Sequence, residues 1–145
     1  MTEQTFDFRI VVEKPIAGAV YGLQKGSGKN YETFQKQEAG PGALVFDITL
    51  PAKRNKEGSV VLYGPFIQGT PQGRFLYLDI GSYAGQEEAP LSGRLKVPLP
   101  GISDEFSRET IDGWFFVAKI YGTDEKTGRP ATGTVKPVDG WKIDK

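Results

Sequence analysis

Apolar and polar residues alternate with period two along several stretches of the chain. In residues 6–12 the apolar positions are Phe6, Phe8, Ile10 and Val12. Residues 44–50 repeat the pattern with Leu44, Phe46, Ile48 and Leu50. Period-two alternation is typical of a β-strand with one buried face. Residues 114–121 are the most hydrophobic segment, apolar on both faces, and predict a strand in the core.

Shorter strands are expected over residues 19–24, 30–37, 59–63, 74–80, 94–99, 134–135 and 141–143, separated by Gly and Pro-rich turns. Residues 30–37 are the most polar and predict an edge strand. One short helix is expected near residues 103–110, where Ser103 can cap it and Asp104 and Glu105 complement its dipole. The pattern predicts an all-β fold, an antiparallel sandwich or barrel of roughly eight or nine strands, with no repeat and no alternation of strands and helices.

Composition and charge narrow the class of protein. A chain of 145 residues with 38% hydrophobic and 12% aromatic residues suits a single folded β domain, residues 1–145. No apolar run is long enough to span a membrane, and the start of the sequence has no secretory signal, so we expect a cytoplasmic protein. Lys plus Arg and Asp plus Glu both number 18, which lacks the positive excess of a nucleic-acid binder.

The sequence contains no His and no Cys. Histidine is the usual general base near neutral pH and a common metal ligand, so Ser-His-Asp triads, Cys-His dyads and ordinary zinc sites are excluded. An enzyme would have to use carboxylates, Lys, Tyr, Ser or Thr, or a cofactor. We therefore favour a protein that is not an enzyme, and we predict no catalytic residue, metal or cofactor.

Two loops resemble ligand-binding motifs only in part. Gly26-Ser27-Gly28-Lys29 has glycines like a phosphate-binding loop, but Leu23 stands where the first Gly belongs and Asn30 replaces the Ser or Thr. Residues 124–128 lack the alternating oxygen ligands of a calcium loop. A hairpin turn and a solvated turn are the better interpretations.

Carboxylates and aromatic residues leave further alternatives. Loop carboxylates could combine in space to hold a cation or to form an acid/base pair, and Asp79 is the first candidate because it is a polar residue within an apolar strand. Aromatic residues could form a stacking platform for a sugar or a base, although most would serve the core. They are Tyr31, Tyr63, Tyr83, Trp114 and Trp141.

Four segments carry a family resemblance: Gly-Leu-Gln-Lys-Gly at 22–26, Gly-Pro-Phe-Ile-Gln-Gly-Thr-Pro at 64–71, Lys-Val-Pro-Leu at 96–99 and Asp-Gly-Trp at 139–141. Together they resemble an uncharacterised bacterial family of about this length, known only as a domain of unknown function. The resemblance covers nearly the whole chain. It implies a small bacterial cytoplasmic protein and no particular activity, substrate or cofactor.

The Gly-rich loops carry hydrogen-bonding side chains, which favours a binding function. The loops at 64–70 and 81–86 leave strand 74–80 by opposite ends, so we predict a site at the Gly81 end, with Asp79, Tyr83 and Gln86, rather than one that includes Gln68. The leading hypothesis is a non-catalytic module for a small polar ligand or a protein partner. The alternatives are a carboxylate-dependent enzyme acting on a sugar or phosphorylated substrate, and a protein that self-associates through a strand edge.

Overall fold

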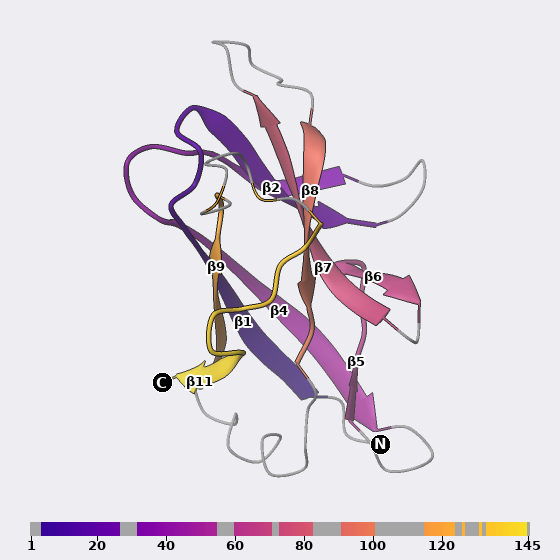
Figure 1. Cartoon of the computed structure of the whole chain (residues 1–145). Helices are drawn as coiled ribbons and strands as arrows, with labels where there is room; N and C mark the ends of the chain where they lie inside the picture. Colours follow the sequence, from indigo (N-terminus) through magenta and orange to yellow (C-terminus); the bar gives the residue numbers. More distant parts are fainter. Residues whose placement is uncertain are drawn as a thin grey trace.

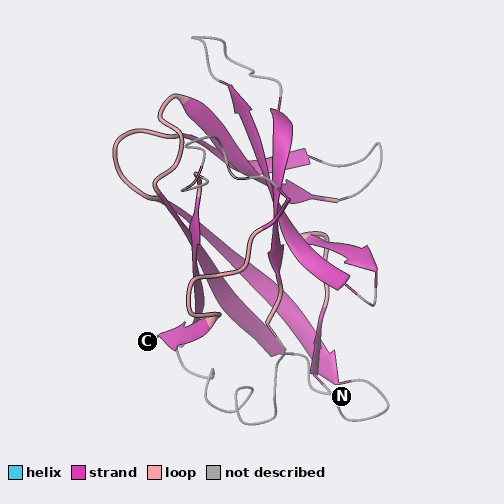
Figure 2. Cartoon of the chain, in the orientation of Figure 1, coloured by secondary structure: helices cyan, strands magenta, loops and turns pink. Residues whose placement is uncertain are grey.

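The computed structural model describes residues 4–26, 32–54, 60–70, 73–82, 91–100, 115–123, 126, 131 and 133–144. These residues form strands and connecting segments, with no helix among them (Figures 1 and 2). Accordingly, the described part of the chain has no helix that could cross a membrane. In chain order the strands are β1 (Gln4–Glu13), β2 (Ala19–Lys25), β3 (Glu32–Glu38), β4 (Leu44–Arg54), β5 (Val60–Leu62), β6 (Ile67–Thr70), β7 (Gly73–Ser82), β8 (Leu91–Pro98), β9 (Phe115–Tyr121), β10 (Gly133–Thr134) and β11 (Lys142–Asp144).

The strands form two sheets. The β1 sheet has the order β11-β9-β1-β4-β5, and the β7 sheet has the order β10-β8-β7-β2-β3. The short strand β6 pairs with the start of β7, while β2 pairs with the end of β7. Among the described residues the two sheets are separate in their strand pairing and share one buried cluster of side chains, which is the arrangement of a sandwich.

Alternation along the strands builds the core. The four apolar positions of β1 are buried, and so are those of β4, because antiparallel pairing in register puts them on the same face. The Phe8 ring stacks on Phe116 with centroids 5.0 Å apart, and Trp141 meets Phe8 edge-on at 5.5 Å. From the β7 sheet the core receives Tyr21, Leu23, Leu76, Leu78, Ile80, Leu95 and Val97.

One edge of the β1 sheet is only partly covered. Strand β5 pairs with β4 at residues 52–54 alone, so among the described residues no strand pairs with residues 44–51 on that side. Two side-chain amides of β3 cross from the other sheet: Gln37 donates to the Val45 carbonyl at 2.8 Å and Gln35 to the Asp47 carbonyl at 3.0 Å. Strand β3 is itself an edge strand, as its polar sequence predicts, and its pairing with β2 is interrupted by an irregularity where Gln35 has φ of 56°. Such bulges discourage pairing with another chain.

The all-β prediction is confirmed, with two differences, and one expectation is not tested. The described residues contain eleven strands rather than eight or nine, and one strand that the pattern does not predict is β6, formed by the Gly-containing segment 67–70. The pairing is not purely antiparallel: β9 runs parallel to β1, and β10 runs parallel to β8. Parallel neighbours need a long connection, and β1 and β9 lie far apart in the sequence. The helix expected near 103–110 lies outside the described residues.

Candidate functional site

Asp79 is buried on the outer face of the β7 sheet. Its strand neighbours Leu78 and Ile80 face the core, and alternation turns Asp79 the opposite way. Nevertheless, Asp79 is only 4% exposed. Its register partner on β8, Arg94, donates from Nε to Asp79 Oδ1 at 2.7 Å. A carboxylate withdrawn from water needs such a partner, because an unpaired buried charge is strongly destabilising.

Arg94 extends this ion pair into a longer network. Its Nη2 donates to Gln24 Oε1 at 2.6 Å, and Gln24 is itself buried. The Gln24 amide nitrogen donates to the carbonyl of Gly26 at 3.3 Å, and Gln68 donates to the same carbonyl at 2.7 Å. Hydrogen bonds therefore connect Asp79 on β7 with Gln68 on β6.

Strand β2 makes this connection possible because it runs antiparallel to β7 and ends beside the turn that precedes β6. The Gly26 N–H donates to the Pro65 carbonyl at 2.7 Å. Gly22 lies opposite Asp79 in the β2–β7 register, where it brings β3 close: a Cβ at Gly22 would come within 2.3 Å of Thr33 Cγ2. The segments 22–26 and 64–68, which carry much of the family resemblance, are thus in direct contact.

Of the three predicted site residues, the structure describes only Asp79. Asp79 lies at the end of the network, whereas Tyr83 and Gln86 lie outside the described residues, so a pocket at the Gly81 end stays a prediction. The predicted site does not include Gln68, because its loop leaves β7 at the other end; in the structure Gln68 is linked to Asp79 by way of β2.

The other sequence candidates do not assemble among the described residues. Tyr63 follows β5 and Trp141 precedes β11, at opposite edges of the β1 sheet, so these two do not share a stacking platform. Tyr31 and Trp114, like residues 27–29 and most of 124–128, lie outside the described part of the chain. Within that part no group of three or more carboxylates is close enough to hold a metal ion.

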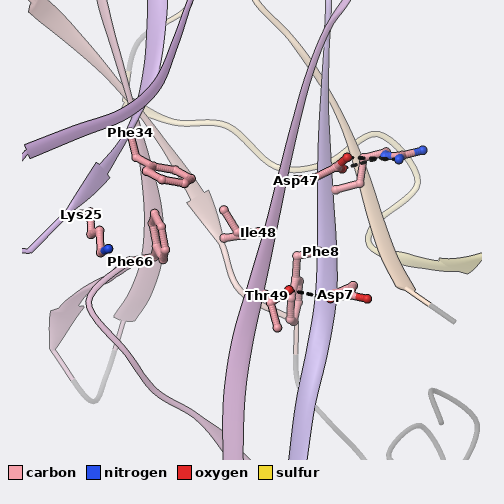
Figure 3. Close-up of a pocket in the computed structure, with 9 residues that line it drawn as sticks. Asp7, Phe8, Lys25, Phe34, Asp47, Ile48, Thr49 and Phe66 are labelled. Atoms are coloured by element: carbon pink, nitrogen blue, oxygen red, sulfur yellow. Dashed lines mark hydrogen bonds and ion pairs between the residues drawn. The ribbon is translucent and has the colours of Figure 1, made fainter. Parts of the chain in front are cut away.

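A cavity of about 390 Å³ opens at the uncovered edge of β4 (Figure 3). Strands β1 and β4 contribute one side, and the opposite side comes from the end of β2, from β3 and from the turn before β6. It is lined by Asp7, Phe8, Arg9, Lys25, Phe34, Asp47, Ile48, Thr49 and Phe66. Its volume lies within the range of small-molecule sites.

The apolar wall of the cavity is an aromatic pair. Phe34 and Phe66 pack edge to face with centroids 5.3 Å apart, and both are only partly buried. Lys25 Nζ lies 5.7 Å from each ring centroid, within range of a cation–π interaction. Ile48 projects from β4 toward the two rings (Figure 3). The wall is therefore apolar, with one positive charge beside it.

The polar side of the cavity is the edge of β4. The Val45 and Asp47 carbonyls point away from β1, toward β3, and the Pro51 carbonyl points the same way to accept from the Tyr63 N–H. Because main-chain groups alternate along an antiparallel strand, the N–H and C=O of Thr49 also point to this side. A ligand bound here could accept a hydrogen bond from the Thr49 N–H and donate one to the Thr49 C=O.

Side chains on the outer face of the β1 sheet are already engaged with each other. Arg9 forms a two-bond ion pair with Asp47, at 2.7 and 3.1 Å, and the Thr49 hydroxyl donates to Asp7 at 2.7 Å. These cross-strand pairs hold β1 and β4 in register beside the cavity.

Sequence reasoning missed the aromatic pair and Lys25. Phe34 is an apolar residue in a polar strand, and Phe66 follows Gly64-Pro65 at a turn, so neither fits the period of a buried face. An isolated aromatic residue in a polar or turn segment was the available signal. That signal does not predict that Phe34 and Phe66, which are 32 positions apart, contact each other.

Comparison with known proteins identifies a family for this chain. The model of a family described as "Family of unknown function (DUF5990)" matches residues 6–144, which confirms the resemblance seen in the sequence. A search of curated proteins finds no match. A search of solved structures finds none either.

Proposed function

We propose a small-molecule binding function for this chain, which belongs to the DUF5990 family of unknown function. The observation that carries the proposal is the cavity of about 390 Å³ with a partly exposed aromatic pair inside it. A concave, largely apolar site with a few convergent polar groups is the usual form of a ligand site. The ligand has an apolar, preferably planar part and a polar part that carries negative charge.

The two parts of the ligand correspond to two parts of the site. The planar part lies against Phe34 and Phe66, because offset and edge-to-face ring contacts add to the burial of apolar area. The anionic part lies near Lys25, whose ammonium is already beside the rings. The main-chain groups of Thr49 orient the ligand.

Binding is favoured over catalysis by the chemistry of the lining. The sequence supplies no His or Cys, and the lining carboxylate of Asp47 is held by Arg9. Asp79, the residue considered for acid/base catalysis, is buried and held by Arg94, and it does not line this cavity. Each of these carboxylates is held in a fixed position by an arginine, as in a structural ion pair.

The test uses 3-phenylpropionate as a probe, because it combines a ring with a carboxylate. We expect it to bind with millimolar affinity in a titration followed by amide NMR shifts, with the largest changes at residues 34, 48, 49 and 66. Phe66→Leu keeps the side chain apolar but removes the ring, and it should weaken binding about tenfold. Lys25→Ala should weaken it about fivefold, since it removes one partly exposed charge pair.

Lys53→Ala is the matched control, because Lys53 also lies over an aromatic ring, that of Tyr63 at 4.9 Å, but outside the cavity. Its affinity for the probe should equal that of the wild type. The amine 3-phenylpropylamine, which reverses the charge, should bind more weakly than the carboxylate. Shifts spread over unrelated surfaces, or equal losses in the Lys25 and Lys53 variants, would contradict the proposal.

A further inference from the structure

The outer face of the β7 sheet carries a second group of charged and aromatic side chains, separate from the cavity. Arg94 and Lys96 alternate with buried Leu95 on β8, so both project from this outer face. Both lie over the ring of Tyr77 on β7: the Arg94 Cζ is 4.5 Å and the Lys96 Nζ 5.8 Å from its centroid. Two cations therefore share one aromatic ring.

Hydrogen bonds and a ring contact hold the Arg94 side chain in place. Its Nε is bonded to buried Asp79 and its Nη2 to buried Gln24, while the Tyr77 ring lies against the guanidinium. The Arg94 side chain still keeps 40% of its surface exposed. Within the described part of the chain no acceptor bonds to its Nη1, so two N–H donors stay available. A guanidinium fixed in this way loses little conformational entropy when it binds an anion.

The charges of this group do not cancel. Asp79 compensates one of the two cations, and Lys96 makes no ion pair with a described residue. Residues two apart on a strand are separated by roughly 7 Å, a span that one tetrahedral oxyanion can bridge by accepting from both side chains. Glu38, an exposed carboxylate of edge strand β3, is three strands away from β8 in the sheet order.

We infer that Arg94 and Lys96, positioned by Asp79, Gln24 and Tyr77, form a binding site for a phosphate group on the outer face of the β7 sheet. Arg94 donates from Nη1 to one phosphate oxygen and Lys96 donates to another. The hydrogen-bond network from Asp79 through Gln24 to Gln68 supports this site, because it fixes the position of Arg94 while the Nη1 donors face the ligand. The site shares no residue with the cavity at β4, so either can exist without the other.

The experiment titrates the full chain with inorganic phosphate and, separately, with phenyl phosphate at low ionic strength, followed by amide NMR shifts. We expect saturable shifts centred on residues 77, 94 and 96. Lys96→Gln removes one cation without touching the Asp79 pair, and it should weaken phosphate binding about tenfold, as the loss of a charge-assisted hydrogen bond does. Lys142→Gln is the control, because Lys142 is an exposed strand lysine on the other sheet.

Arg94→Lys keeps the charge but loses the planar guanidinium, and it should also weaken binding, with the melting temperature measured in parallel to detect loss of folding. Tighter binding of phenyl phosphate than of inorganic phosphate identifies an organic phosphate ester as the ligand, and equal binding identifies the free ion; both support the site. Absence of saturable shifts at residues 77, 94 and 96 overturns it. So does an equal loss of affinity in Lys96→Gln and Lys142→Gln.

Discussion

The close approach of β2 and β3 at Gly22 predicts that a larger residue at this position lowers the stability of the protein. A Cβ at this position would lie 2.3 Å from Thr33 Cγ2 and 3.3 Å from Lys36 Cγ. The first contact is about 1 Å too short for van der Waals packing, and Thr33 is β-branched with a restricted χ1, so the edge strand must shift or the rotamer must change. In Gly22→Ala, overpacking costs about 1–3 kcal/mol, and the lower entropy of unfolded Ala returns about 0.5–1 kcal/mol.

The net expectation is that Gly22→Ala lowers the free energy of unfolding by about 1–2 kcal/mol in urea titrations, with an unchanged m-value. Gly42→Ala is the matched control, because a Cβ at Gly42 meets nothing within 4 Å; it should change stability by less than about 0.5 kcal/mol. Thr33→Ala removes the clashing methyl group. In that background Gly22→Ala should cost less than about 0.5 kcal/mol, giving a coupling energy of about 1 kcal/mol. An equal cost in both backgrounds would refute the explanation.

Three further predictions concern the core and its edges. Tyr21→Phe removes the oxygen that accepts from the Ile16 N–H at 2.9 Å and should cost about 1–2 kcal/mol at neutral pH in urea titrations. Burial raises the pKa of Tyr21 above 10.0, so the folded state keeps the proton longer than the unfolded state does; wild-type stability should fall as the pH rises above 10.0, whereas the Phe variant lacks this loss and the two curves converge. Phe8→Ala should lower stability by about 3–5 kcal/mol by calorimetry, because the ring is fully buried, and a loss below about 1 kcal/mol would contradict its place in the core. Gly122→Ala would bring a Cβ within 2.8 Å of the Pro15 Cα, which is backbone, so it should cost about 3 kcal/mol and more than Gly22→Ala in the same urea assay.

The sequence predicted the strands whose two faces differ in polarity. In β1 and β4, every second residue is apolar, and those residues are the ones buried against the other sheet. The polar character of β3 likewise predicted its place at an edge. In these segments the burial of one face determines the order of apolar and polar residues, so the strand can be predicted from its own sequence.

The sequence pattern did not predict which distant strands pair with each other. The parallel neighbours β1 and β9 depend on how a long connection returns, and β6 depends on its contact with the start of β7 rather than on its own Gly-containing sequence. Local propensity is weak information at such positions.

The candidate sites show the same division. Asp79 stood out as a polar residue within an apolar strand, but its partner Arg94 is 15 positions away and Gln24 is 70 positions from Arg94. The cavity joins Phe34 to Phe66 and Lys25 across three segments. Polarity along one strand reveals a candidate residue, whereas the contacts that give it a role exist only after the sheets have paired.

The most direct test of the proposed binding function is a crystal structure of the protein soaked with 3-phenylpropionate. We expect electron density for the probe at the edge of β4 that lacks a neighbouring strand, with its ring against Phe34 and Phe66 and its carboxylate beside Lys25. An empty cavity at a soaking concentration well above the affinity measured in solution, or a probe bound elsewhere on the molecule, would contradict it.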